Sequence, residues 1–581
     1  MKWVLILCLF FLLIPWVYAQ DGHIKLLAVK EVNGTFSGET ADLYLSLQPG
    51  TGRVFLETFP LTKMDTQIST RFAKDIACSY FDFDCHNYDF VYTIKAKTNI
   101  VGGPSAGAAM TALTTAVLSG LEIDESVAVT GTINSGGLIG PVGGLKEKIK
   151  VASDENLNVV LIPGGTRFQE ENNLTLDLES YGRKHGVSVI EVFDLNNLVF
   201  QLTGTQLRVE NLSLEADAEY VEIMNRVAEQ LCNITEEIQS ELEDYDLSER
   251  ETEFLKNQTI LAEDALAKGL DYAAASYCFG GNAIGRKILY REQNLTEEEM
   301  QEKALELKTE VRKFEVEIEM KSLKTITDLQ TFSIVSERLN EAKELLDDLE
   351  SDDYGSLALA QERLFSAQAW SEFFEMSGKE YMMDENILRD SCLKKIQEAK
   401  ERKQYLDFFI LKDIESTSRK IVSAEEFYQD DDFALCIVTA SEAKAEVDAM
   451  LSVIGLEMDK LDTLLEHKLK SVDQSLARTT NEGSFPFLAF AYYQYALDLR
   501  ENDPSSALIY AEYALELGNL DMYFEDEPLL RESLITTRGG KMLFVFGAVF
   551  GSALTLLIVL IIKKFGKTPR TTRRQSGGKK R

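Results

Sequence analysis

The placement of proline constrains the fold of this chain more than any other feature. Prolines recur up to Pro163, and none then occurs until Pro486. Proline disrupts helix interiors, and the intervening stretch is rich in Glu, Leu, Ala and Lys, which favour helices. We therefore expect helix to follow helix, and we predict an all-α domain over residues 206–535.

A loose repeat runs through this helical stretch. An acidic turn is followed by an alanine-rich helix at Asp271, Asp353, Asp432 and Asp503. Small residues at helical spacing allow close helix packing, and the last copy resembles a tetratricopeptide-type helix pair. Two interpretations stay open, a solenoid-like stack that offers a surface to a protein partner and an irregular helical bundle that serves as a spacer.

Residues 20–205 have a different pattern, in which strand and helix signals alternate. "IKLLAVKEV", "SVAVTGTI" and "NVVLIPGG" are typical of strands, and "SAGAAMTALTTAVLSG" is typical of a helix. The alternation predicts a separate α+β domain ahead of the helical one.

The two ends of the chain indicate a membrane protein. Residues 1–19 combine one lysine, an apolar run and a small-residue cleavage site, as in secretory signal peptides. Residues 542–562 contain no charge and are long enough for a transmembrane helix. The tail, 563–581, has nine Lys or Arg and no acid, which is typical of the cytoplasmic side. We predict a single-pass type I protein of the cell membrane, with its N-terminal part outside the cytoplasm.

Cysteine and charge give further expectations. Six cysteines follow the signal segment, and an even number permits disulfides, with buried free thiols as the alternative. Cys78 and Cys85 are the pair that we expect to close a small loop.

The formal net charge of −35 disfavours nucleic acid as a partner. Glycosylation motifs predict a glycoprotein, and they begin at Asn33, Asn173, Asn211, Asn233, Asn257 and Asn294.

Ser105 stands in a glycine-rich turn, "NIVGGPSAGAAM", ahead of the alanine-rich helix. It has three possible roles: a nucleophile, a hydroxyl in a phosphate-binding loop, or a helix cap. The sequence has no H-E-x-x-H zinc motif, no G-x-S-x-G elbow and no G-x-x-x-x-G-K-[ST] phosphate loop. The four histidines of the chain leave a Ser-His-Asp triad open by count, and a serine without a histidine can use a lysine as its base.

A lysine serves as such a base when burial keeps its amine neutral. In "GPVGGLKEKIKVASDEN", Leu145, Lys148, Ile149 and Ala152 recur at helical spacing and predict one buried stripe. Lys148 is the one lysine of this segment on that stripe. The alternative is that Lys148 lies at the surface and only its aliphatic stem packs.

Three stretches resemble the proteolytic domain of Lon proteases: "GGPSAGAAM", "VAVTGTINSGGLIGPVGGLKEKI" and "NVVLIPG". The resemblance covers residues 24–200 and implies a ribosomal-protein-S5-type α+β fold with a Ser105–Lys148 dyad. It further implies that Thr130 orients the lysine. The backbone amides of Gly103, Ser105 and Ala106 are the candidates for stabilising the oxyanion, and no cofactor or metal is implied.

The sequence departs from the family pattern at two positions, where Gly102 and Thr132 replace acidic residues. We expect an ATP-independent, membrane-anchored and archaeal-like serine endopeptidase that lacks the ATPase domain and acts on polypeptides. Because Lon domains tend to form rings, we also expect a homo-oligomer. The alternatives are a catalytically degenerate domain that serves as an adaptor, and a small-molecule kinase whose loop binds phosphate.

Overall fold

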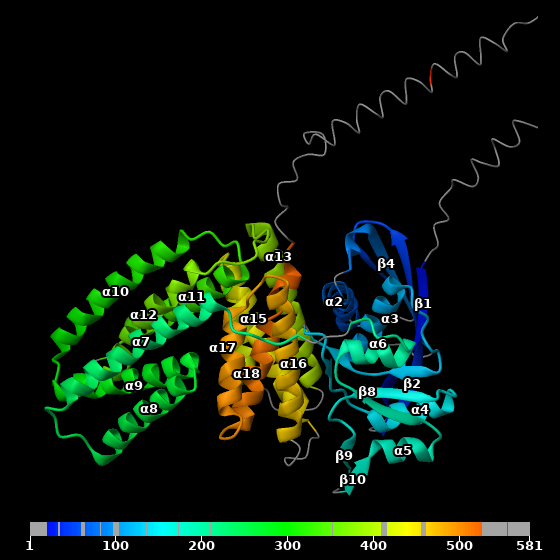
Figure 1. Cartoon of the computed structure of the whole chain (residues 1–581), viewed down its shortest axis with the longest axis horizontal. Coiled ribbons are helices and arrows are strands. Elements are labelled where there is room, and N and C mark those ends of the chain that lie inside the picture. The colour runs from blue at the N-terminus through cyan, green and yellow to red at the C-terminus, as the bar shows by residue number, and fades with distance from the viewer. Residues whose placement is uncertain are drawn as a thin grey trace, which may run out of the picture. The chain divides into compact units, whose positions relative to one another are not determined.

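The structure is a computed structural model of the chain. It describes residues 20–32, 35–59, 64–81, 83–96, 104–134, 136–171, 174–208, 212–350, 352–407, 415–454, 461–525 and 555. The chain divides into two units, Met1–Glu525 and Asp526–Arg581. Apart from Thr555, the described residues all belong to the first unit, which contains an α/β region and a helical region (Figure 1).

The α/β region is built on one mixed sheet, whose described strands have the order β11-β8-β5-β1-β2-β4-β3. The strands are β1 (Gln20–Val32), β2 (Thr35–Pro49), β3 (Val54–Phe59), β4 (Tyr88–Ala96), β5 (Val127–Val129), β8 (Val159–Pro163) and β11 (Ser188–Val192). The β1–β2 and β2–β4 pairs are antiparallel. On the other side of β1, the strands β5, β8 and β11 run parallel to one another. Two small hairpins accompany the sheet, β6 (Thr132–Ile133) with β7 (Ile139–Gly140) and β9 (Phe168–Glu171) with β10 (Leu174–Asp177).

Helices cover both faces of this sheet. They are α2 (Met64–Tyr80), α3 (Gly107–Ser119), α4 (Leu145–Asp154), α5 (Leu178–Lys184) and α6 (Leu195–Thr203). Successive strand residues point to opposite faces, and Leu26 of β1 accordingly packs in the core with α2, α3 and α6. Its neighbour Leu27 packs in a second core with α4 and α5.

The predicted fold class requires correction. The N-terminal region is α/β rather than α+β, because neighbouring parallel strands need connections that cross a face of the sheet, and these carry helices. The predicted transmembrane helix at 542–562 lies outside the described residues, apart from Thr555. In the described part of the chain, no helix combines the length and the apolarity that a bilayer crossing requires.

The predicted location in the cell membrane is corrected on the same finding. The helix α7 (Ala218–Leu242) has 25 residues, but its apolar side chains form one buried stripe and its other side is charged. Such a helix packs on a core rather than in lipid. The structure therefore gives no support to a single-pass membrane protein. The predicted signal peptide at 1–19 and the tail at 563–581 lie outside the described residues.

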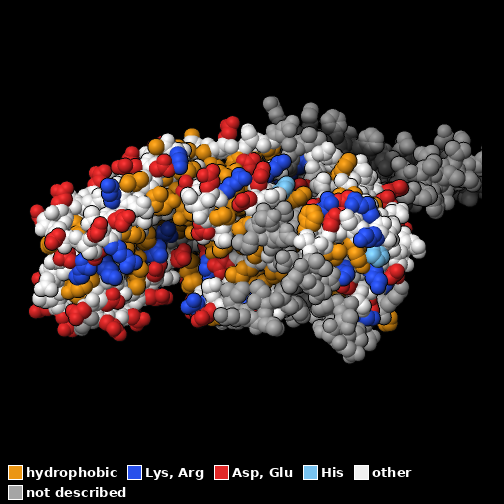
Figure 2. Space-filling view, turned by 90° about the horizontal axis from the view of Figure 1, so that it is seen from below, with side chains coloured by type: hydrophobic (Ala, Val, Ile, Leu, Met, Phe, Trp, Pro, Cys, Tyr) orange, Lys and Arg blue, Asp and Glu red, His pale blue; other side chains and the backbone are white. Residues whose placement is uncertain are grey.

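The helical region follows the α/β region, as the scarcity of proline predicts. After α7 its helices are α8 (Glu249–Ala267), α9 (Asp271–Glu292), α10 (Glu297–Glu319), α11 (Ile326–Asp347), α12 (Tyr354–Trp370), α13 (Glu385–Leu406), α14 (Glu415–Gln429), α15 (Phe433–Val453), α16 (Leu461–Asn481), α17 (Phe487–Leu499) and α18 (Pro504–Leu517). Acidic side chains are spread over the visible face of this region (Figure 2), in keeping with the negative charge.

The aspartates of the sequence repeat each stand at the start of a helix. Asp271 is the first residue of α9, and Asp353, Asp432 and Asp503 are the N-cap residues of α12, α15 and α18. Two of these side chains cap the helix directly, since the backbone N–H of Ser356 donates to Asp353 at 3.0 Å and that of Ser506 to Asp503 at 3.1 Å. The repeat therefore reflects helix starts. The domain boundaries predicted above stay predictions.

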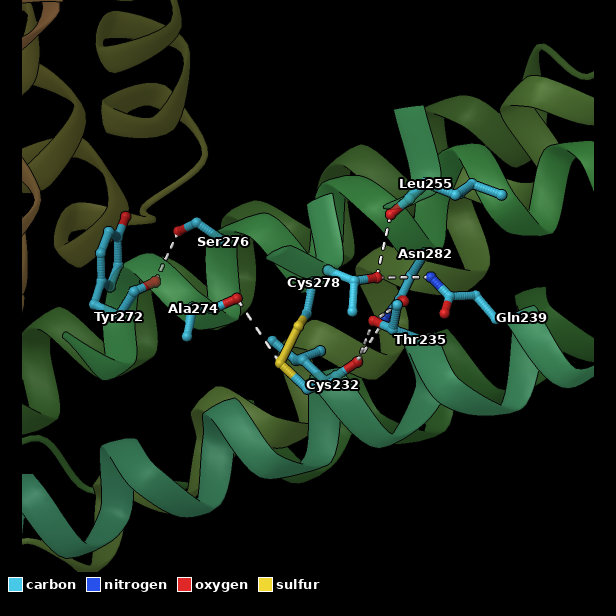
Figure 3. Close-up of a disulfide and its surroundings, with 11 residues drawn as sticks. Cys232, Thr235, Gln239, Leu255, Tyr272, Ala274, Ser276, Cys278 and Asn282 are labelled. Carbon is cyan, nitrogen blue, oxygen red and sulfur yellow. Dashed lines mark hydrogen bonds between the residues drawn. A yellow bond between two sulfur atoms is a disulfide. The ribbon is translucent and has the colours of Figure 1, made fainter. Parts of the chain in front are cut away.

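Three disulfides lie within the described residues, and one of them joins Cys78 to Cys85. The second joins Cys232 on α7 to Cys278 on α9 (Figure 3). Beside it, the Thr235 hydroxyl donates to Asn282 Oδ1 at 2.6 Å, so a covalent and a polar link fix the same two helices. The third joins Cys392 on α13 to Cys436 on α15.

A cluster of buried charges holds α13, α15 and α18 together. Glu516 Oε2 accepts from Lys395 Nζ at 3.0 Å, and Glu516 Oε1 accepts from Lys444 Nζ at 2.7 Å. All three side chains are at most 1% exposed. Burial by itself raises the pKa of Glu516, but the two ammonium groups outweigh that effect and hold the pKa well below its usual range.

This cluster predicts a large loss of stability for Glu516→Gln. The substitution leaves Glu398 as the buried carboxylate beside the two ammonium groups, at 3.8 Å from Lys395 Nζ and 3.6 Å from Lys444 Nζ. Loss of the two shorter pairs with Glu516 costs about 3 kcal/mol in the free energy of unfolding. Chemical denaturation at neutral pH measures the difference, with the exposed Glu501→Gln as the matched control. Because the folded-state pKa of Glu516 is lowered, its contribution is full above the unfolded value of 4.5. The gap between wild type and variant should therefore shrink as the pH falls below 4.5.

Candidate functional site

Ser105 lies at the start of α3, in the 3-10 turn Pro104–Ala106, and its side chain is half-buried. The N-cap residue of α3 is Ala106, and no side chain caps the helix there. Interpreting Ser105 as a simple helix cap therefore has no support. From Gly107 to Val117, α3 is buried throughout, so the serine stands where a rigid core helix begins.

Lys148 lies on α4, which packs on the opposite face of the sheet. The structure buries Leu145, Lys148, Ile149 and Ala152, the four residues of the stripe that the sequence pattern defines. The Lys148 side chain is 1% exposed, whereas Lys150 on the same helix is exposed. The alternative of a surface lysine with a packed stem is therefore wrong.

Thr130 and Gly131 lie where β5 ends, and they join the two layers. Lys148 Nζ donates to Thr130 Oγ1 at 2.9 Å, and Thr130 Oγ1 lies 3.5 Å from the Ser105 carbonyl oxygen. The Gly131 N–H donates to the same carbonyl at 3.0 Å, and the Ala108 N–H donates to the Gly131 carbonyl at 3.0 Å. One threonine side chain thus contacts the serine segment and the lysine amine together.

Burial lowers the pKa of Lys148 from 10.5 to about 7. The cause is loss of solvation, which disfavours the charged ammonium. An amine with this pKa is about half neutral near pH 7, and the neutral form has a lone pair available to accept a proton.

Steric constraints require a glycine at position 144, directly before α4. Gly144 has φ +67°, in the left-handed region, and a Cβ there would lie 2.6 Å from Val29 Cγ1. Glycine alone fits both conditions, so the chain turns sharply and enters α4 against the sheet. The helix starts directly after this turn, where the Lys148 N–H donates to the Gly144 carbonyl at 3.0 Å, and the Lys148 side chain reaches Thr130 at the end of β5.

The structure places the remaining candidates as follows. Ser105 and Ala106, two of the oxyanion candidates, lie in the turn that leads into α3, and Gly103 lies outside the described residues. Gly102 also lies outside them, and Thr132 is a buried residue of β6. The roles of these residues in catalysis stay predictions.

Two residues of the helical region reach this site, and sequence reasoning missed both. Arg402 on α13 donates from Nη2 to the Ile133 carbonyl. The N–H of Gly143 donates to Tyr405 Oη at 3.1 Å. Both contacts join segments more than 250 residues apart, and no local spacing or periodicity reports such a pairing.

Residues 86–180 match the family model of the Lon protease (S16) C-terminal proteolytic domain. The chain is 32% identical over 131 residues to a Lon protease of Paraburkholderia phytofirmans, which is 22% of this chain and 16% of that protein. It is 32% identical over 130 residues to that of Rickettsia conorii, covering 22% and 15%. With that of Phenylobacterium zucineum it shares 40% identity over 81 residues, covering 13% and 10%.

The chain thus spans a tenth to about a sixth of the length of these relatives. The matches support a serine peptidase function for a region that contains Ser105, Thr130 and Lys148. Membrane anchoring, an archaeal-like nature and glycosylation receive no support from them. The expected homo-oligomer and the expected protein partner of the helical region stay predictions.

The surroundings of Lys148 predict a titration near neutral pH. In protein with ¹³C-labelled lysine, one Cε signal should titrate at about pH 7 and be absent from Lys148→Met. Thr130→Val removes the oxygen that accepts from the ammonium, so we expect the midpoint to move below that of the wild type. A wild-type chain in which no lysine titrates below pH 9 would contradict the prediction.

Proposed function

We propose that this chain is a serine endopeptidase that hydrolyses polypeptides with a Ser105–Lys148 dyad and without ATP. The observation that carries the proposal is the buried Lys148 amine, held 2.9 Å from Thr130, whose oxygen also lies against the Ser105 carbonyl. Burial lowers the pKa of Lys148 to about 7, and a buried amine without a carboxylate among the described residues is costly to the fold. It is well suited to accept a proton.

The dyad accounts for peptide hydrolysis in two steps. Ser105 Oγ attacks the peptide carbonyl carbon, and neutral Lys148 accepts the hydroxyl proton. As the tetrahedral intermediate collapses, the lysine gives that proton to the leaving amine, and an acyl-enzyme ester remains. Lys148 then takes a proton from a water molecule, which attacks the ester, and the acid product leaves as Ser105 recovers its proton.

Other groups of the site have supporting roles in this proposal. The positive end of the α3 dipole lies beside Ser105, where negative charge develops on the carbonyl oxygen of the substrate. Thr130 orients the lysine amine through its hydrogen bond. ATP independence is proposed because the sequence contains no G-x-x-x-x-G-K-[ST] loop.

Cleavage of an unfolded protein by the full chain, in the absence of nucleotide, tests this function. Ser105→Ala and Lys148→Met should each lower kcat/KM by roughly a thousandfold or more, since each removes a member of the dyad. Lys148→Met keeps most of the side-chain volume and removes a buried amine, so its thermal stability should not fall. Lys150→Ala, on the exposed side of the same helix, is the matched control and should cleave like the wild type.

The competing functions give different results in this assay. An adaptor built on a degenerate domain predicts no cleavage by wild type and no labelling of Ser105 by a serine-directed covalent probe. Cleavage that appears only when ATP is added would refute nucleotide independence but not the dyad. Equal activity in wild type and Ser105→Ala would refute the dyad.

A further inference from the structure

The helical region contacts the segment that joins Thr130 to Lys148 at three places. Its β6–β7 hairpin carries Leu138 at the tip, and this side chain, 6% exposed, belongs to the hydrophobic core of the helical region. A Cβ on the adjacent Gly136 would lie 3.1 Å from Leu515 Cδ2 of α18. The hairpin tip is therefore inserted among helices rather than exposed to water.

A second contact fixes the base of the hairpin. The buried Arg402 donates from Nη2 to the Ile133 carbonyl of β6 and pairs through Nε with Asp448 Oδ1 on α15 at 3.2 Å. Ile133 in turn touches the first turn of α3, because a Cβ on Gly107 would meet Ile133 Cγ2 at 3.1 Å. Arg402 thus holds a strand that lies directly against the Ser105 turn.

A third contact fixes the entry to α4. The Gly143 N–H, two residues before the helix, donates to Tyr405 Oη at 3.1 Å. Burial raises the pKa of Tyr405 to about 12, so the phenol stays neutral and remains a hydrogen-bond partner at every working pH. Arg402 and Tyr405 lie one turn apart on α13 and therefore contact, from one helix face, two points of the segment that joins Thr130 to Lys148.

We propose that Arg402 and Tyr405 are positioning residues of the peptidase, through which the helical region keeps the Lys148 amine desolvated and aligned with Thr130. The proposal rests on the function proposed above. Without these contacts the Gly143 N–H and the Ile133 carbonyl need water as a partner. Water beside α4 solvates Lys148 and moves its pKa toward 10.5, so less of the neutral base is present at pH 7.

Tyr405→Phe tests the proposal because it removes one oxygen atom and keeps the ring. The Lys148 titration midpoint in ¹³C-lysine spectra should rise by about 0.5–1 pH unit, and kcat/KM below pH 7 should fall by about three- to tenfold. Above pH 9 the lysine is neutral in both proteins, so the activity of the variant should return to the wild-type level. A general loss of structure would lower activity at every pH instead.

The matched control is Tyr220→Phe, which removes a buried hydroxyl that donates to Gln494 Oε1 at 3.2 Å, within the helical region. In Tyr220→Phe the titration midpoint of Lys148 and the pH profile of kcat/KM should equal those of the wild type. A second variant, Arg402→Gln with Asp448→Asn, removes the charge pair without leaving one partner buried alone. It should raise the midpoint in the same direction as Tyr405→Phe.

The outcomes separate this proposal from the proposed function. An unchanged Lys148 midpoint in both Tyr405→Phe and the double variant would overturn the positioning role. Faster cleavage in either variant would also overturn it, because α13 would then be a cover that restricts the site. If the midpoint shifts as expected while no protein cleaves substrate, the coupling stands and the peptidase function fails.

Discussion

The exclusion of water from one lysine amine is the condition on which the candidate site depends. Lys148 belongs to the buried stripe of α4, and its pKa of about 7 follows from its burial there. An ammonium in such surroundings is disfavoured by its lost hydration, so the fold must supply the packing that keeps it there. The glycine turn at Gly144 packs α4 against the sheet, and a contact from α13 reaches the residue before that turn.

The two-sided sheet explains how serine and lysine come to one place. Ser105 belongs to the layer of α3, and Lys148 belongs to the layer of α4 on the other face. Neither helix passes through the sheet, so a meeting point exists only where a strand ends. Thr130 lies directly after β5, and its hydroxyl contacts Lys148 Nζ of one layer and the Ser105 carbonyl of the other. The carboxyl ends of strands in α/β sheets are a common place for such sites.

Periodicity predicts those features that depend on neighbours in sequence. The buried stripe of Lys148 and the helix starts at the repeated aspartates follow from spacing alone. The α/β layering and the contacts of Arg402 and Tyr405 do not, because parallel strand pairing and contacts over 250 residues leave no local pattern. Buried Lys395 and Glu516 likewise have the sequence signature of ordinary exposed charges, and only the packing of three helices distinguishes them.

The insertion of Leu138 into the helical core has a consequence for dissection of the chain. A fragment that ends near residue 205 would present this leucine, the Ile133 carbonyl and the Gly143 N–H to solvent, although all three are engaged in the intact protein. The α/β region therefore lacks the closed surface of an independently folding module. Cutting the chain at the junction of the two regions would therefore open a shared interior rather than sever a linker.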